Sequence, residues 1–127
     1  MGFAGVQPED LRTVVVNAAY RISSADKVVA QTGTMTASRV FLLPRATSMQ
    51  PGQEILVVDE SGTVTGSNTI VITRQASDTI GAGTTSSITA AYGSRRLVCD
   101  GLSKWTVVNP ADPLDAEFVI SGRMFGR

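Results

Sequence analysis

Four acidic residues in the middle of the sequence carry the kind of side chain that acid–base hydrolysis needs. Asp59, Glu60, Asp78 and Asp100 are the carboxylates available there, and a pair of carboxylates is the general requirement for glycoside hydrolysis. All four lie at or next to turn positions, where Asp is favoured because its side chain bonds the nearby backbone. We therefore predict that these acids form turns and aid solubility, and that they are not catalytic.

Other enzyme chemistry is limited by the residues that the sequence lacks. There is no histidine and only one cysteine, Cys99, which excludes His-dependent triads and the usual tetrahedral zinc sites within one chain. The sequence also has no Gly-x-Ser-x-Gly nucleophile motif. We predict a protein that is not an enzyme and that uses no cofactor and no metal. Cys99, next to apolar Val98, is expected to be a small buried strand residue.

Two stretches have a superficial likeness to ligand-binding loops. Residues 81–87 are rich in Gly, Thr and Ser, but they lack the lysine and the following helix of a phosphate-binding loop. Residues 59–62 begin with an acid, but the alternating oxygen ligands and the distal Glu of a calcium loop are missing. Both stretches are therefore predicted to be structural turns.

Trp105, the single tryptophan, has two interpretations. With Tyr92 it would offer a surface on which a sugar ring stacks, but a Trp that follows an Asp-Gly turn and opens the apolar run 105–108 is more often a core residue. We favour the core position and keep carbohydrate binding as the alternative. The pair Arg95-Arg96 is expected at a strand edge, where charge blocks unwanted pairing, with an interface contact as the alternative.

Length and composition indicate one domain with few electrostatic partners. The chain has 127 residues, 43% of them hydrophobic and 17% charged, and its formal net charge is zero, so one core is expected and nucleic acid is not an expected partner. Of eleven basic residues only Lys27 and Lys104 are lysines, and arginine suits protein interfaces. No secretion signal, myristoylation motif or membrane-spanning run is recognised, so we expect a soluble product made in a reducing cytosol.

The elements that must position these residues are short β-strands. From Thr32 onward Thr, Val and Ile dominate, and Gly or Pro interrupts them at intervals typical of sandwiches, barrels or β-helices. No helical segment of useful length separates the strands, which disfavours parallel α/β folds. The strand segments are expected within residues 19–22, 27–31, 39–44, 51–62, 68–73, 78–80, 97–101 and 105–108.

Two of these strands are apolar on both faces. Residues 55–58 and 70–72 contain only Ile, Leu and Val, a pattern that belongs to strands covered on both sides. One face packs inside the protomer and the other needs a second layer, for which a neighbouring subunit is the economical source. We predict an all-β compact sandwich, barrel or β-helix-like module assembled as a homotrimer. The predicted core residues are Ile55, Val57, Ile70, Ile72, Trp105 and Val107.

The two ends of the chain differ in character from the middle. Residues 1–17 read as an N-terminal arm, residues 18–108 as the β-domain, and residues 109–127 as a proline-punctuated linker and C-terminal arm. Large apolar side chains near chain ends are liabilities unless they dock on a partner. The candidate interface or attachment residues are Phe3, Val6, Leu11, Phe118, Ile120, Met124 and Phe125.

The order of the turn motifs resembles a domain that recurs in virion proteins of tailed bacteriophages, found in head fibres, capsid decoration proteins and tail fibres. The similarity covers roughly residues 20–108, and each motif is weak alone. One departure is the stretch 81–83, where similar proteins often have Asp-Gly or Asn-Gly. The motifs are Leu43-Pro44, Pro51-Gly52, Asp59 with Ser61-Gly62, Ile70 with Ile72, Asp78 with Ile80, Tyr92-Gly93-Ser94, Asp100-Gly101 and Trp105.

The resemblance implies a structural module of a phage particle, commonly a homotrimer, that assembles in the host cytoplasm and binds other virion proteins such as the major capsid protein. Because the chain is about one module long, a capsid decoration (cement) or head-fibre protein is the favoured interpretation. A tail-fibre or baseplate component is the first alternative. A carbohydrate-binding module that recognises a host surface glycan is the second.

Overall fold

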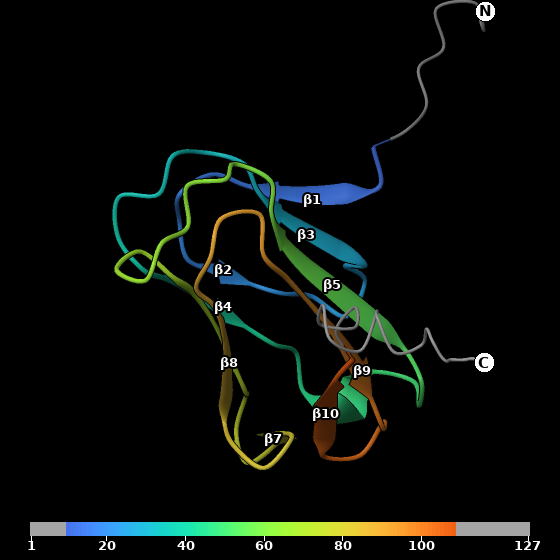
Figure 1. Cartoon of the computed structure of the whole chain (residues 1–127). Helices are drawn as coiled ribbons and strands as arrows, with labels where there is room; N and C mark the ends of the chain where they lie inside the picture. The colour runs from blue at the N-terminus through green and yellow to red at the C-terminus, as the bar shows by residue number, and fades with distance from the viewer. Residues whose placement is uncertain (1–9, 109–127) are drawn as a thin grey trace, which may run out of the picture.

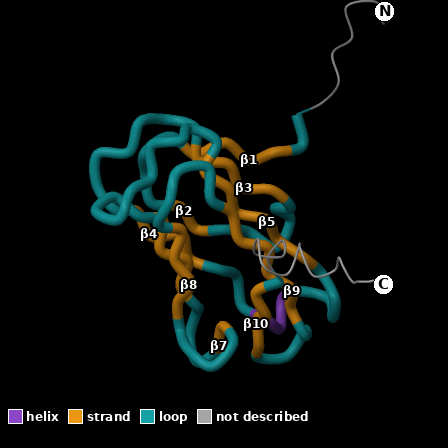
Figure 2. Tube along the Cα trace, viewed as in Figure 1, coloured by secondary structure: helices purple, strands orange, loops and turns teal. Residues whose placement is uncertain are grey.

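Ten short strands in two sheets form the part of the chain that the structure describes, residues 10–108. In this computed structural model (Figure 1) the only helix in that part is the single turn η1 (Ala46–Ser48), drawn in purple in Figure 2. The all-β prediction is therefore confirmed. One sheet has six strands, in the order β1 (Arg12–Val15), β3 (Val28–Gln31), β5 (Glu54–Asp59), β9 (Ser94–Cys99), β10 (Lys104–Val107) and β7 (Thr79–Ile80). The other has four, in the order β2 (Tyr20–Arg21), β4 (Arg39–Leu42), β6 (Ile70–Thr73) and β8 (Thr85–Ile88).

The first six strands alternate between the two sheets. As a result β1, β3 and β5 are parallel neighbours in one sheet, and β2, β4 and β6 are parallel neighbours in the other. Parallel strands need a long crossover connection, and here each connection contains a strand of the opposite sheet in place of a helix. The antiparallel strands β8 and β9 then follow β6 and β5, respectively. The architecture combines two facing sheets with a first half wound like a β-helix.

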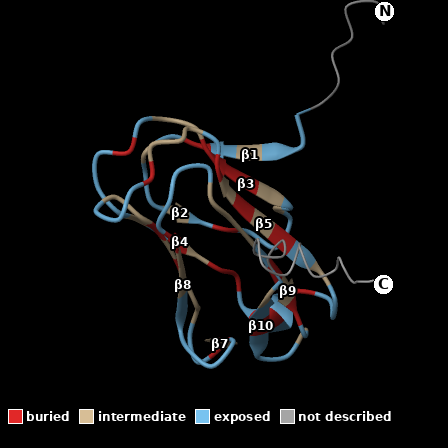
Figure 3. Ribbon diagram, viewed as in Figure 1, coloured by how far each residue is buried: buried red, intermediate tan, exposed pale blue. Residues whose placement is uncertain are grey.

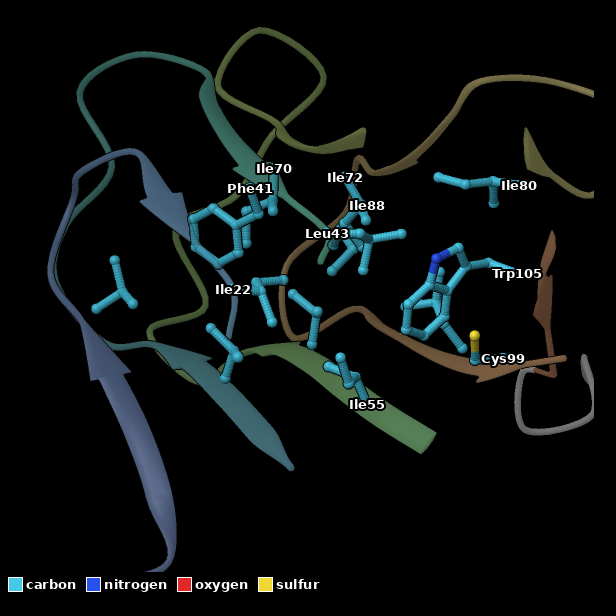
Figure 4. Packing of buried hydrophobic residues seen from close by; sticks show 14 of the residues in the cluster. Ile22, Phe41, Leu43, Ile55, Ile70, Ile72, Ile80, Ile88, Cys99 and Trp105 are labelled. Carbon is cyan, nitrogen blue, oxygen red and sulfur yellow. The ribbon is translucent and has the colours of Figure 1, made fainter. Parts of the chain in front are cut away.

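A single core lies between the sheets. Alternate residues of β5 and β6 point into it, so Ile55, Val57, Ile70 and Ile72 are fully buried. Figure 4 shows Phe41 and Ile70 at one end of this core and Trp105 with Cys99 at the other. Val107, the sixth predicted core residue, is half-buried and packs against the cluster. Buried positions alternate with more exposed ones along β5, as the red and paler bands of Figure 3 show.

Two strands, β1 and β8 (Thr85–Ile88), lie outside the predicted strand segments. β1 forms from residues assigned to the N-terminal arm. It pairs with β3, with Arg12 opposite Val28 at one end and Val15 opposite Gln31 at the other, so the sheet begins before residue 18. β8 forms from the second half of the loop-like stretch 81–87 and pairs with β6. It is polar except for Ile88, and β-propensity is weaker than the pairing that β6 offers.

The arginine pair also lies elsewhere than expected. Arg95 and Arg96 belong to β9, which is paired on both sides, by β5 and β10, and is therefore no edge strand. Arg95 nevertheless serves an edge, because its guanidinium donates to the carbonyl of Ser87 on β8, the last strand of the other sheet, at 2.8 Å. That bond satisfies an edge carbonyl and ties the two sheets together.

The chain ends lie outside the described residues, and with them most predictions about arms. Phe3, Val6, Phe118, Ile120, Met124 and Phe125 are among them, whereas Leu11 is described and is 75% exposed. Over residues 10–108, no helix has the length and apolar character needed to cross a membrane.

Candidate functional site

Asp59, the first candidate acid, is a buried hub for the backbone of two loops. Its Oδ1 accepts hydrogen bonds from the N–H and hydroxyl of Ser61, at 3.1 and 2.6 Å, and its Oδ2 accepts from the N–H groups of Val64 and Tyr92, both at 3.2 Å. Burial raises the pKa of the Asp59 carboxyl, but these hydrogen bonds outweigh it, and the net pKa is lowered. Both oxygens are occupied by the fold itself, as the turn prediction requires.

The other three candidate acids have separate structural partners. Asp78 is buried and accepts from the N–H of Ala46 at 2.7 Å. Asp100 is exposed, and its Oδ1 alone accepts from three N–H groups, those of residues 102, 103 and 104, which lower its pKa. Glu60 pairs with Arg12. Each acid thus has structural partners of its own, and within residues 10–108 no group of three metal-ligating side chains comes together.

The stretch 81–87 is a turn followed by a strand. Ile80 and Gly83 exchange two backbone hydrogen bonds, each 2.9 Å, and the chain then enters β8. The predicted structural turn therefore agrees with the structure in the first half of this stretch. In the second half the prediction is wrong, because a strand forms there.

Trp105 is completely buried. It lies beside Cys99 and Ile80 in the core (Figure 4), and in the described part its Nε1 is the single buried side-chain polar atom without a hydrogen-bond partner. A ring with no exposed surface cannot stack on a sugar, so Trp105 does not form the platform considered as the alternative. Cys99, also predicted to be buried, is 1% exposed, and burial raises the pKa of its thiol.

Tyr92 is the aromatic residue that remains on the surface. It is 70% exposed and its backbone has φ 61°, in the left-handed region that non-glycine residues seldom adopt. The ring lies directly against Gly62, where a Cβ would come within 2.3 Å of it. Asp59 accepts from the Tyr92 N–H, so a buried carboxylate holds the backbone that carries this exposed aromatic ring.

The β1 end of the six-stranded sheet is exposed and apolar. Leu11, Val14 and Val16 are 75%, 45% and 61% exposed, and β1 pairs on one side only, with β3. In Figure 3 this strand is largely pale blue. An edge strand with exposed aliphatic side chains is a ready template for another chain.

A hollow of about 740 Å³ lies on the outer face of the six-stranded sheet. Val28 on β3 and Leu56 on β5 are register partners, and Leu56 is in turn paired with Arg96 on β9. These side chains point away from the core, because their strand neighbours Val29, Ile55 and Leu97 are the buried ones. We call this feature the outer groove; it is lined by Lys27, Val28, Gly52, Gln53, Glu54, Leu56, Ser94 and Arg96.

Two polar clusters that join the strands were not predicted from the sequence. Gln31 is fully buried, accepts from the N–H of Asn17 and donates to the carbonyl of Gly33 and the hydroxyl of Ser61. Asp26 accepts from the hydroxyls of Thr13 and Tyr20 at 2.6 and 2.7 Å. Burial is the largest cause and the Asp26 carboxylate the next, and they raise the pKa of Tyr20 to about 12. Only knowledge of the strand pairing would have brought these residues together.

The motif residues of the sequence thus occupy positions that hold turns or fill the core. Asp59 and Asp78 bond backbone amides, Gly62 leaves room for a ring, and Trp105 is buried. The virion resemblance remains a prediction. Comparison of the chain with models of known protein families and with curated protein sequences finds no match.

Proposed function

We propose that this protein is a structural component of a tailed-bacteriophage particle, a capsid decoration (cement) or head-fibre protein that binds the particle surface as a homotrimer. The observation that carries the proposal is the use of the motif residues. Asp59, Asp78, Gly62 and Trp105 hold loops and core, as expected of a scaffold whose recurring residues preserve a shape.

Exposed apolar surface supports assembly. Leu11, Val14 and Val16 lie at the open β1 edge, and Val40 on β4 is 47% exposed. Burying aliphatic side chains of this kind is worth about 25 cal/mol per Å² removed from water. The sites lie on both sheets, so one protomer has more than one surface to offer to neighbours, as a closed ring of three requires.

The outer faces of β5 and β6 are less bare than the sequence suggested. Leu56, Val58 and Val71 are half-buried within a single chain. The doubly apolar strands therefore need less cover from another subunit than their sequence predicts, and the β1 edge becomes the stronger candidate interface.

Native mass spectrometry and light scattering test the oligomer, and virion fractionation tests the location. We expect a trimer at micromolar concentration that co-purifies with particles. A matched pair of variants, Val14→Lys at the exposed edge and Thr106→Lys on β10, which is also exposed, separates interface from general surface charge. Loss of trimer in both variants, or a folded monomer in the wild type, would contradict the proposal.

Deleting residues 1–9 or residues 109–127 tests attachment, since large apolar side chains near the chain ends are the candidate attachment residues. For the attaching arm we expect loss of particle binding while the domain stays folded. A deletion that unfolds the domain but leaves binding intact would show that the arm is part of the fold.

Host-glycan binding is the second candidate function, and Tyr92 is the observation that favours it. An exposed tyrosine with a fixed backbone suits stacking on a sugar ring. A glycan array with wild type and Tyr92→Ala tests this function. Glycan binding that depends on Tyr92 would make host recognition the favoured function. Absence of glycan binding by the wild type would exclude host-glycan binding as a candidate.

A further inference from the structure

We propose that the C-terminal segment, residues 109–127, covers the outer groove of its own chain, with Phe118 and Ile120 against Val28 and Leu56. The proposal does not depend on a role in a virion. It gives Phe118 and Ile120 a place on the domain itself and leaves Met124 and Phe125 as attachment residues.

The floor of the outer groove is aliphatic and its borders are charged. Val28 and Leu56 are side-by-side partners on neighbouring parallel strands, and both are only half-buried. Lys27 lies on one border, while Arg96 and Glu54 lie on the other, 3.7 Å apart. Such a surface suits an extended segment that presents large apolar side chains toward the floor and acids toward the rim.

The described chain ends next to this groove. The N–H of Val108 donates to the carbonyl of Arg96 at 2.7 Å, and Arg96 lines the groove. The path from Val108, at the end of β10, across β9 and β5 to β3 covers three strand spacings, roughly 14 Å. Residues 109–116 reach roughly 26 Å when extended, so the segment can return to its own groove without help from a second copy.

The sequence of the segment matches the groove in pattern and in charge. Phe118 and Ile120 are two residues apart and therefore share one face of an extended segment, with Val119 on the other face. The acids Asp112, Asp115 and Glu117 come just before them. Within residues 10–108 Lys27 takes part in no salt bridge, so these acids meet a cation that the domain leaves available.

Carbodiimide cross-linking of the full-length protein tests the proposal, because it joins a lysine to a carboxylate only when they touch. Lys27 and Lys104 are the only lysines in the chain, which makes the products easy to map by mass spectrometry. We expect links from Lys27 to Asp112, Asp115 or Glu117 and none from Lys104. A Lys27→Arg variant removes the reactive amine and should abolish them.

Two further variants separate docking from chance proximity. Phe118→Asp should reduce the Lys27 cross-link by roughly tenfold or more, since it removes the burial of one large side chain, and Val119→Asp should leave it unchanged. Both substitutions lie outside the ten strands, and circular dichroism checks that the domain stays folded. Absence of the Lys27 link in the wild type, or equal loss in both variants, would overturn the proposal.

Mixing isotope-labelled and unlabelled chains before cross-linking identifies which copy supplies the segment. We expect links only within one isotope class. Links between classes would overturn the proposal in favour of an exchanged segment from a second copy.

Discussion

Replacing Trp105 with Ala should be among the most damaging single changes in this protein. The side chain is fully buried, and it fills the end of the core next to Cys99 and Ile80 (Figure 4). Truncation of a buried Trp or Phe to Ala costs about 3–5 kcal/mol through lost burial and the cavity left behind. For a domain of this size that loss lowers the melting temperature by at least about 10 °C.

Trp105→Phe is the control that the structure itself provides. Its indole N–H is buried without a partner, and leaving a donor unpaired costs about 1–3 kcal/mol. Phe removes that donor while keeping most of the side-chain volume. The cost of the unpaired N–H is then gone, and this gain offsets much of the cost of the small cavity that Phe leaves. We expect the Phe variant to lose less than about 1.5 kcal/mol.

Urea unfolding followed by far-ultraviolet circular dichroism gives both numbers, since it does not depend on tryptophan fluorescence. All variants must be compared at one protein concentration, because oligomer formation makes apparent stability depend on it. Near-unchanged stability of Trp105→Ala would refute the core assignment, and loss of glycan binding as well would favour a recognition module. A Phe variant as unstable as the Ala variant would refute the role given to the unpaired N–H.

Three other predictions concern the turns. Asp59→Asn should lower the free energy of unfolding by at least about 2 kcal/mol, because both carboxylate oxygens accept buried hydrogen bonds and an amide nitrogen cannot accept. Asp100→Asn should lower it little, since one oxygen accepts all three hydrogen bonds of that side chain. Urea unfolding of both variants shows whether they differ. The pKa of Asp59 is lowered in the folded state, so its contribution to stability is complete above the unfolded pKa near 4 and is lost as pH falls below about 4. An acid titration in which Asp59→Asn loses stability as steeply as wild type would contradict this prediction. Gly101→Ala should lower the melting temperature more than Gly52→Ala. Both glycines have positive φ, but only at Gly101 would a Cβ press on the ring of Pro51, at 2.8 Å. Equal melting temperatures of the two variants would argue against the clash.

The parts of the fold that sequence predicted well are those governed by local pattern. Ile55 and Val57 on β5 and Ile70 and Ile72 on β6 are buried because aliphatic side chains alternate there. Asp59 and Gly62 were expected in a turn, because short-range hydrogen bonding and positive φ are properties of a few neighbouring residues.

Strand order and buried polar contacts depend on distant partners and escaped prediction. β8 has few apolar residues, and it is a strand because β6 pairs with it. β1 was assigned to an arm because nothing near Arg12 indicates its partner β3. Gln31 reads as an ordinary polar strand residue, and its burial follows from the meeting of loops that begin at Asn17 and Ser61.

The candidate site was predictable to a similar extent. The turn role of the acids followed from residue type, while the outer groove depends on the pairing of Val28 with Leu56 and of Leu56 with Arg96. The bond between the Tyr92 N–H and Asp59 also had no sequence signal, because the two residues lie 33 positions apart in the chain.

The number of copies of this chain in purified virions decides whether the protein is a structural component of a phage particle. Quantitative mass spectrometry against the major capsid protein gives that number. A decoration or head-fibre role predicts many copies per particle, in a multiple of three. Absence of the chain from particles, together with its presence in the lysate of the infected host, would contradict the account.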